Sequence, residues 1–253
     1  MSINGAKVVA VIEARMTSSR LPGKVIMPAG GQPLLAVLAE RLGRVLRIDQ
    51  IVVATTVNAT DEPIVAVARE AGVGWFRGSE EDVLERVCGC LRANDADVCV
   101  EITGDCPLVD PAIVDEMLDA YAAQSDQHFY FSNSDPQRSV PAGLDVQVFA
   151  AAALHELDRE TTDPADREHV SYGLYRPESG DRWKPRFIKH PRAAGGEGLL
   201  VTLDYREDYE LIKALHEDLA AQGSEYGAPE IIRWIRSHPE LHEPCLRVRA
   251  EVA

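Results

Sequence analysis

The stretch KVVAVIEA, residues 7–14, decides how this chain folds. It is an almost unbroken run of apolar, mostly β-branched residues, which is typical of a strand buried on both faces of a sheet. Further strands are predicted at residues 50–55, 74–77 and 97–103, and helical periodicity lies between and after them at residues 34–46, 61–71, 81–93 and 111–123. Strands and helices that alternate at this spacing predict an α/β fold, in which βαβ units build a mostly parallel central sheet covered on both faces.

The pattern changes after residue 125. Shorter strands are predicted at residues 129–133, 145–149 and 199–203, and helices at residues 150–160, 167–175, 205–220 and 229–237. A loop rich in glycine, proline and basic residues covers residues 189–198. Because no linker or repeat interrupts the chain, we expect a single domain, residues 1–253, with parts at residues 1–125, 126–198 and 199–253.

Composition and charge exclude several classes of protein. The chain has 253 residues, 41 acidic against 26 basic, which leaves a net charge of −15. Such a surface repels nucleic acid and anionic membranes, so we expect neither as a partner. Apolar runs are too short to span a membrane and we see no signal peptide, so a cytoplasmic location is expected. The five scattered cysteines are expected to be free thiols, and Cys88 and Cys90 have no second pair at zinc-ligand spacing.

The most informative motif is the loop ARMTSSRLPGK, residues 14–24, which begins where the first strand ends. Open α/β sheets bind ligands at that end of their strands. Backbone N–H groups of a small, flexible loop can bind phosphate oxygens, while Arg15, Arg20 and Lys24 neutralise their charge. The alternative is a solvated basic loop, but Pro22 and Gly23 indicate a shaped turn.

Two familiar phosphate motifs do not fit this chain. A Walker loop would need glycine where Ser18 stands. Gly72 and Gly74 precede a predicted strand instead of following one, and Arg77 stands where a dinucleotide motif needs its third glycine. NAD binding and P-loop hydrolysis are therefore disfavoured.

Two aspartates follow predicted strands near this loop. Asp105 comes just after residues 97–103, and Asp204 comes just after residues 199–203. Alone, the first could stabilise a turn and the second could cap a helix. Together they predict a site for Mg²⁺, which prefers oxygen ligands and bridges to phosphates. Residues 95–97 form an Asp-x-Asp sequence like the metal motif of glycosyltransferases, but it begins a strand and so lies at the wrong edge of the sheet.

Seven segments, in this order along the chain, resemble the cytidylyltransferases that make CMP-activated acidic sugars, particularly the spore-coat polysaccharide branch. They are residues 14–24, 24–35, 76–84, 103–111, 143–146, 167–170 and 203–209. One such match would be weak, whereas seven in order between about residues 7 and 219 are specific.

The resemblance implies a three-layer, Rossmann-like nucleotidyltransferase fold of the GT-A-like kind, CTP as donor, Mg²⁺ as cofactor and a homodimer. It makes residues 1–125 the nucleotide-binding half, residues 126–198 a small insert for acceptor binding and dimerisation, and residues 199–253 a closing strand and helices. Carried over by position, the nucleotide-binding residues are Ala14, Arg15, Ser18, Ser19, Arg20, Lys24, Arg77, Gly78, Ser79, Glu80, Thr103, Gly104 and Asp105. The implied catalytic residues are Arg15, Arg20, Lys24 and Asp105, the metal ligands Asp105 and Asp204, and the acceptor-binding residues Asp145, Arg167, Glu168 and His169.

Three residues depart from the family pattern. Glu13 stands where glutamine or proline is expected, Gln32 where lysine is frequent, and Cys106 where enzymes specific for the sugar acid Kdo have an acidic residue. These departures concern the acceptor more than the donor.

The sequence thus predicts an enzyme that transfers CMP from CTP to a small anionic acceptor and releases pyrophosphate. The acceptor is either a 2-keto sugar acid or a phosphonate or phosphate ester. An anionic acceptor is favoured by the basic residues of the second half: Arg138, Arg167, Lys184, Arg186, Lys189 and Arg192. Two alternatives are a catalytically silent nucleotide-binding module that regulates a polysaccharide pathway, and a metal-dependent glycosyltransferase.

Overall fold

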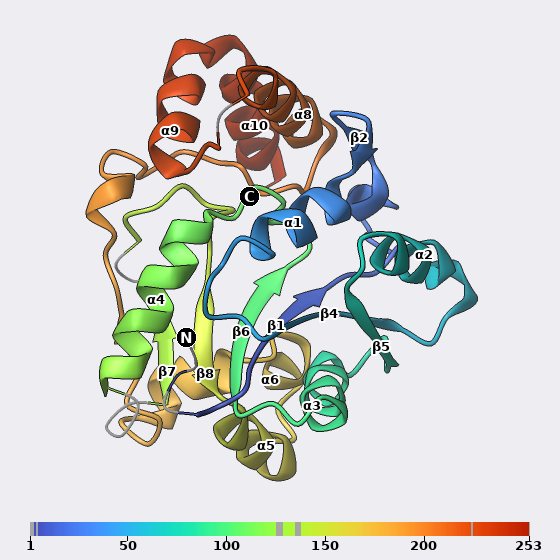
Figure 1. Ribbon diagram of the computed structural model, residues 1–253, viewed down its shortest axis with the longest axis vertical. Coiled ribbons are helices and arrows are strands. Elements are labelled where there is room, and N and C mark those ends of the chain that lie inside the picture. Colours follow the sequence, from blue (N-terminus) through green and yellow to red (C-terminus); the bar gives the residue numbers. More distant parts are fainter. Residues whose placement is uncertain (1–2, 4, 125–128, 135–137, 224, 253) are drawn as a thin grey trace.

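A seven-stranded sheet forms the centre of the computed structural model, which describes residues 3, 5–124, 129–134, 138–223 and 225–252 (Figure 1). The strands lie in the order β5-β4-β1-β6-β8-β7-β9. Their bounds are β1 Val8–Glu13, β4 Gln50–Thr56, β5 Gly74–Gly78, β6 Val98–Thr103, β7 Tyr130–Ser132, β8 Gln147–Ala150 and β9 Arg186–Phe187. Strands β5, β4, β1 and β6 are mutually parallel, whereas β8 is antiparallel to both β6 and β7. The predicted mostly parallel sheet is therefore confirmed.

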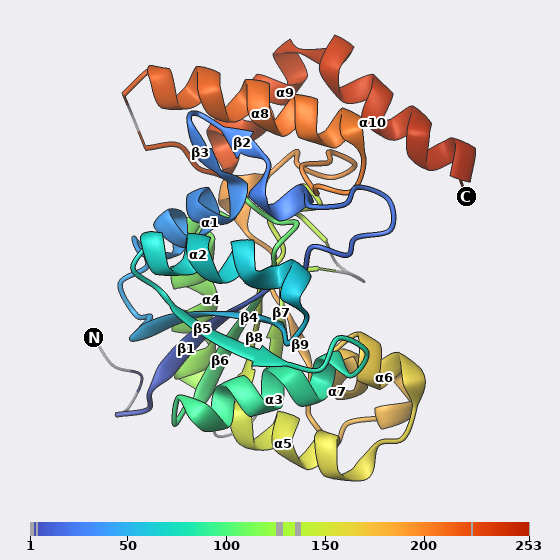
Figure 2. The ribbon, with the colours of Figure 1, turned by 90° about the vertical axis from the view of Figure 1, so that its right-hand side faces the viewer.

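Helices cover both faces of this sheet (Figure 2). Helices α1 (Leu34–Leu42), α2 (Glu62–Glu70) and α4 (Pro111–Gln124) pack on one face, and α3 (Val83–Ala93) and α5 (Ala151–Glu160) pack on the other. Because side chains alternate along a strand, Ala10 and Ile12 join the first core while Val9 and Val11 join the second. Strand β1 lies between two parallel neighbours and under two helical layers, which explains its unbroken apolar sequence.

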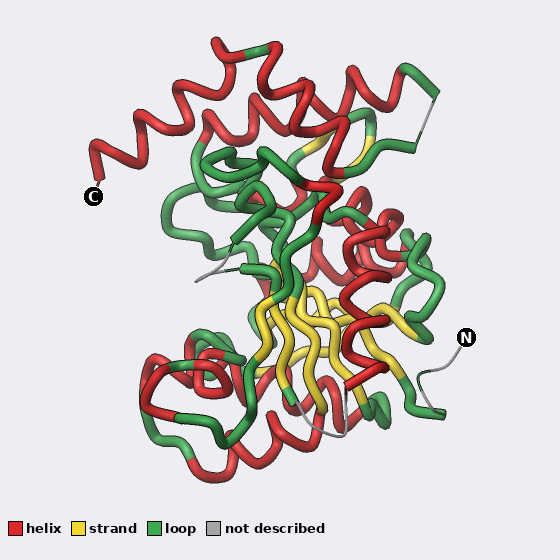
Figure 3. The backbone as a smooth tube through the Cα atoms, turned by 90° about the vertical axis from the view of Figure 1, so that its left-hand side faces the viewer, coloured by secondary structure: helices red, strands yellow, loops and turns green. Residues whose placement is uncertain are grey.

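Three helices lie beyond the carboxyl ends of β1 and β6, at the top of Figure 1. They are α8 (Arg206–Ala221), α9 (Ala228–Ser237) and α10 (Pro239–Val252), and they pack against one another. Helix α8 also contacts β2 (Pro28–Ala29), which pairs with β3 (Gln32–Pro33) in a small hairpin. Figure 3 shows loops filling the space between these helices and the sheet. The loops that follow β1 and β6 therefore face the C-terminal helices.

Two predicted elements are wrong. The helix predicted at residues 167–175 is two short helices, α6 (Pro164–Glu168) and α7 (Tyr172–Tyr175), because Val170 between them has a φ of 40° and stops the first helix. Residues 199–203 form no strand, and only Leu200 makes an isolated bridge, to Ala142. Helix α10 was not predicted.

Other expectations concern the whole chain. The five cysteines are free, as predicted, and all of them are buried. No helix in the described ranges is long and apolar enough to cross a membrane. The expected boundary between residues 125 and 126 lies outside the described residues. Dimerisation through residues 126–198 stays a prediction.

Candidate active site

The loop after β1 has a defined shape. The N–H of Gly23 donates to the carbonyl of Met16 at 2.9 Å, which brings the two ends of the loop together. Gly23 has a φ of 70°, in the left-handed region that glycine adopts without strain, and the next residue, Lys24, begins a 3₁₀ turn. The backbone therefore turns Lys24 back toward the end of β1.

A buried aspartate anchors this loop to the neighbouring strand. Asp61, which is fully buried, accepts a hydrogen bond from the N–H of Met16 at 2.9 Å. It also accepts from the hydroxyls of Thr55 and Thr56 and from the N–H of Thr56, at the end of β4. The helix predicted to begin at Asp61 begins at Glu62, and the Asp61 side chain makes no capping bond to it. Asp61 therefore holds the loop against the end of β4.

The loop forms one wall of a cavity of about 360 Å³, which we call the loop cavity. Its lining includes many of the predicted site residues: Ala14, Arg15, Ser18, Ser19, Arg20, Lys24, Thr103, Gly104, Asp105, Glu168, His169 and Asp204. Glu13, Val25, Val83 and Arg86 complete it. Parts of the chain far apart in sequence thus meet where β1 and β6 end.

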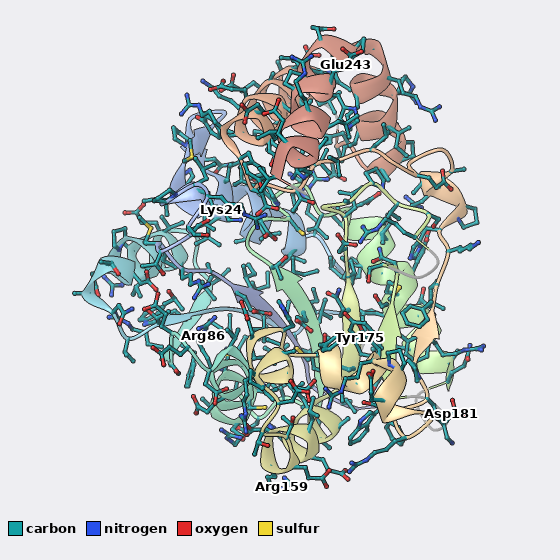
Figure 4. All side chains as sticks on the ribbon, turned by 180° about the vertical axis from the view of Figure 1, so that it is seen from behind. Lys24, Arg86, Arg159, Tyr175, Asp181 and Glu243 are labelled. Atoms are coloured by element: carbon teal, nitrogen blue, oxygen red, sulfur yellow. The ribbon has the colours of Figure 1, made fainter. Side chains whose placement is uncertain are left out.

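Lys24 lies between the two predicted metal ligands. Its Nζ is 3.0 Å from Oδ1 of Asp204 and 3.3 Å from Oδ2 of Asp105, so both carboxylates face the same ammonium group. Arg20 also contacts Asp204, at 2.9 Å. The side chains of Lys24, Asp105 and Asp204 are only 12, 26 and 14% exposed, respectively, which keeps these charges partly out of water. In Figure 4, Lys24 lies nearer to the C-terminal helices than Arg86 and Tyr175 do.

The donor set at this point fits a magnesium ion that is shared with a phosphate ligand. Within the described ranges no group of three or more His, Cys, Asp or Glu side chains could hold a metal ion alone. Mg²⁺ is commonly bound by one or two carboxylates together with substrate phosphates and water. Asp105 and Asp204 supply two such carboxylates beside a cationic loop. An added cation would have to share this position with Lys24 or displace its ammonium group.

Residues 77–80 do not line the loop cavity. The Arg77 guanidinium donates to the carbonyls of Thr56 and Asn58 and pairs with Glu62. Glu80 accepts hydrogen bonds from Thr17 and Asn58, so it fastens the outer part of the loop. Gly78 packs against Arg86, where a Cβ would lie 2.9 Å from Cγ. Ser79 accepts from Arg86 through its carbonyl and from the N–H of Asp82 through its hydroxyl.

A second cavity of about 360 Å³ adjoins the first. The two share Glu13, Thr103, Glu168 and His169, and the second cavity continues to these residues: Glu101, Ser134, Arg138, Asp145, Gln147, Val170, Ser171 and Tyr175. Asp145 accepts from Arg138 at 2.5 Å and from the N–H of Gly143 at 3.0 Å. Burial raises the pKa of Asp145, although Arg138 opposes the shift.

Arg167 lines neither cavity, unlike the other three predicted acceptor residues. It pairs with Asp158 at 2.6 Å and with Asp82 at 3.3 Å, and so joins α6 to α5 and to the start of α3. Asp97 lies at the opposite end of the parallel strands, just before β6, where it accepts from the N–H of Lys7 at 2.8 Å. The Asp-x-Asp sequence therefore lies away from both cavities, as its position predicted.

Three charged residues of these cavities were not singled out in the sequence. Arg86 is 2% exposed and lies on the buried side of α3, and Glu101 is 5% exposed within β6. Both could have been found in the sequence, because each is a charged residue among the apolar residues of a predicted buried face. Arg138 had been counted only among the basic residues of the second half. Of these, Arg86 contributes to the loop cavity and the others to the second cavity.

Comparison with known proteins gives a consistent result. The family model described as Cytidylyltransferase matches residues 9–220. The chain is 33% identical over 235 residues, 91% of this chain and 94% of the relative, to the spore coat polysaccharide biosynthesis protein SpsF of Bacillus subtilis. Among solved structures, a cytidylyltransferase from Leptospira borgpetersenii is 29% identical with a TM-score of 0.85, covering 94% of this chain and 97% of that one.

A more distant structure shows the same fold. It is CMP:2-keto-3-deoxy-manno-octonic acid synthetase complexed with CTP, which is 18% identical with a TM-score of 0.63 and is matched over 87% of this chain and 100% of that one. The predicted Rossmann-like nucleotidyltransferase fold is thereby confirmed. The chain belongs to the cytidylyltransferase family of nucleotidyltransferases.

Proposed function

We propose that this protein transfers CMP from CTP to a small anionic acceptor and releases pyrophosphate. The observation that carries the proposal is the convergence of the cationic loop with Asp105 and Asp204 in one cavity at the ends of β1 and β6. Membership of the cytidylyltransferase family supports a cytidine nucleotide as donor. The relative SpsF, named for spore coat polysaccharide biosynthesis, supports a sugar as acceptor. The synthetase of similar fold is named for the sugar acid 2-keto-3-deoxy-manno-octonic acid, which makes a sugar acid the first acceptor class to test and a phosphonate or phosphate ester the second.

The reaction requires in-line placement more than covalent help from the protein. An acceptor oxygen forms a bond to the α-phosphorus, the bond to the bridging oxygen breaks, and that oxygen keeps the electron pair and leaves as pyrophosphate. A hydroxyl acceptor releases its proton to water. Charge develops on the phosphoryl oxygens, so preorganised cations stabilise the transition state.

The residues of the loop cavity divide this work. Arg15, Arg20 and Lys24 would neutralise the phosphates, and the loop N–H groups would donate to their oxygens. Asp105 and Asp204 would hold a magnesium ion, which when bound supplies positive charge to the phosphate oxygens. Glu168 and His169, which line both cavities, would face the acceptor.

The test is a screen for pyrophosphate release. Four nucleoside triphosphates are crossed with sugar acids, phosphonates and phosphate monoesters, in the presence of Mg²⁺. We expect release with CTP and one acceptor class. Binding of CTP without release for any acceptor would favour the silent module, and consumption of a sugar nucleotide in place of a free triphosphate would favour the glycosyltransferase.

The Asp105→Asn variant tests the site itself. Loss of one electrostatic contact to the transition state costs on the order of a hundredfold or more in rate, so we expect at least that loss. Asp119→Asn is the matched control, because Asp119 is an exposed acid that pairs only with Arg47 among the described contacts. Normal turnover by a folded Asp105→Asn protein would contradict the assignment.

A further inference from the structure

The second cavity has an unusual distribution of charge for a site that receives an anion. Four carboxyl groups line it, from Glu13, Glu101, Asp145 and Glu168. Among the described residues of its lining, Arg138 alone carries a guanidinium group, and it pairs with Asp145. An anionic group of the acceptor would therefore meet more carboxyl groups than cations in this cavity, whereas the basic loop next to it would attract that group.

Glu101 is the decisive residue. It lies within β6, with its side chain on the same face as the apolar side chain of Cys99, and is 5% exposed. Its Oε2 is buried and has no hydrogen-bond partner among the described residues. A buried carboxyl oxygen without a donor is costly, so its retention at the wall of a cavity indicates a donor that comes with a ligand.

Glu13 lies beside Glu101 at the junction of the two cavities. Strands β1 and β6 are parallel neighbours, with Val11 opposite Glu101 and Glu13 opposite Thr103, so the two glutamates lie diagonally on one face. Oε1 of Glu13 also has no partner among the described residues. Burial raises the pKa of both carboxyl groups, and each is close enough to the other to share a proton.

We propose that Glu101 and Glu13 bind a protonated primary amine of the acceptor, so that the acceptor is zwitterionic: an amino-bearing sugar acid, phosphonate or phosphate ester. This inference rests on the proposed function. An ammonium group has three N–H donors and a positive charge, which matches two orphaned carboxyl oxygens. Among the described residues, Arg86 acts on Glu13 electrostatically but makes no hydrogen bond to its Oε1, and no cation acts on Glu101. A hydroxyl group supplies one donor and no charge, so Glu101 and Glu13 would still share one proton between their carboxyl groups.

The same arrangement orients the acceptor. The amine is held by Glu101 and Glu13 in the second cavity, and the anionic end points past the junction into the loop cavity, toward Arg15 and Lys24. Opposite charges at the two ends of the ligand meet opposite charges in the two cavities. The acceptor oxygen then lies on the side where the triphosphate is expected.

Matched pairs of compounds test the inference, because each pair replaces an amine by a hydroxyl at the same position. The pairs are D-glucosaminate and D-gluconate, 2-aminoethylphosphonate and 2-hydroxyethylphosphonate, and D-glucosamine 6-phosphate and D-glucose 6-phosphate. Binding is measured by calorimetry on the full chain with Mg²⁺ and a CTP analogue whose α,β-bridge is a methylene group. We expect the amine to bind at least tenfold tighter in at least one pair.

Variants assign that preference to the pair of glutamates. Glu101→Gln keeps the shape and removes the charge, so it should lose at least tenfold affinity for the amine and leave the hydroxyl compound unchanged. Glu13→Gln should act in the same direction. Glu197→Gln is the control, because Glu197 is exposed and lines neither cavity. Thermal unfolding shows whether each variant is folded.

The outcomes separate this inference from the proposed function. No preference for the amine in any pair, no binding of any of the three amines, or an unchanged preference in Glu101→Gln overturns the inference. Pyrophosphate release from CTP with hydroxyl acceptors at equal efficiency would do so while leaving CMP transfer intact. Failure of CTP itself to bind would instead overturn the proposed function.

Discussion

Single residues of the site could be predicted from the sequence, as Lys24, Asp105 and Asp204 show. Lys24 was identified as a cation of the loop that begins where the first strand ends, and Asp105 and Asp204 because each comes just after a predicted strand. The carboxyl ends of parallel strands meet on one side of a sheet. The structure brings all three together across as many as 180 positions of sequence. Asp204 meets the others even though the strand predicted before it is absent, since the N–H of Leu203 still donates to the carbonyl of Asp105 at 2.8 Å.

Replacement of Lys24 by methionine should separate two effects of its charge. Without the ammonium group, the rate should fall on the order of a hundredfold, because a cation near the phosphates is lost. The two carboxylates would then face each other unneutralised, so Mg²⁺ alone should raise the melting temperature of Lys24→Met more than that of the unaltered protein. Differential scanning fluorimetry with and without Mg²⁺ measures this, and Lys213→Met on α8 is the control. An equal or smaller magnesium effect in Lys24→Met would argue against a shared metal site.

Asp61 is a residue whose role the sequence did not reveal, because the loop that it holds through the N–H of Met16 lies 45 positions away. Asp61→Ala leaves several donors unsatisfied and should lower the free energy of unfolding by about 1–3 kcal/mol at pH 7. Burial by itself would raise the pKa of Asp61, but hydrogen bonds from Thr56, Met16 and Thr55 outweigh it and lower the pKa.

A lowered native pKa fixes the sign of the pH dependence. The Asp61 carboxylate stabilises the protein above the unfolded pKa of about 4, and that contribution is lost as the pH falls through the native pKa. Urea unfolding at pH 7 and at pH 3 should therefore show a smaller difference between Asp61→Ala and the unaltered protein at the lower pH. A difference that is constant or larger at pH 3 would contradict this account.

Secondary structure elements were predictable wherever periodicity and burial agree. Strands β1, β4, β5 and β6 and helices α2 and α3 lie close to their predicted ranges, whereas α1 ends at Leu42, four residues before the predicted end. The region of α6 and α7 departs from its predicted helix, since Val170 takes a left-handed backbone conformation there while its side chain is 1% exposed. Burial of Val170 in the core beneath α3 and α5, which local sequence does not show, overrides helix propensity at that point. The break places Glu168, His169 and Ser171 at the second cavity.

A substitution at Gly104 tests whether the ends of β1 and β6 must lie close together to form the site. A Cβ on Gly104 would lie 2.8 Å from the carbonyl oxygen of Glu13, to which its own N–H donates. Gly104→Ala should therefore separate the strand ends and cost about 1–3 kcal/mol of stability. It should also weaken CTP binding, measured by calorimetry. In Gly43→Ala, the control, a Cβ would lie 3.3 Å from its nearest neighbour, and both effects should be smaller. Unchanged CTP affinity in Gly104→Ala would show that this contact does not shape the loop cavity.

At the scale of the whole molecule, the C-terminal helix is connected to the site through one network. Arg249 of α10 makes two contacts with Asp208, at 2.6 and 2.9 Å, and lies 3.8 Å from Asp204. Asp208 in turn accepts from the N–H groups of Asp204 and Tyr205 at the start of α8. Neither the resemblance nor the family match at residues 9–220 includes α10, so nothing local in the sequence connected it with the site.

Arg249→Ala should consequently weaken magnesium binding and activity, although Arg249 is not expected to contact the metal or the substrates. Substitution of residues that orient metal ligands typically costs about 10–100-fold in metal affinity or activity, and we expect an effect in that range. The Mg²⁺ concentration that gives half-maximal pyrophosphate release should rise, because the backbone of Asp204 is no longer held by a neutralised Asp208. Arg249→Lys, which keeps the charge but not the paired contacts, should be intermediate. Arg247→Ala on the same helix is the control, since Arg247 is exposed and two residues away. If Arg249→Ala lowers thermal stability but leaves the magnesium dependence unchanged, α10 supports the fold and does not orient the site.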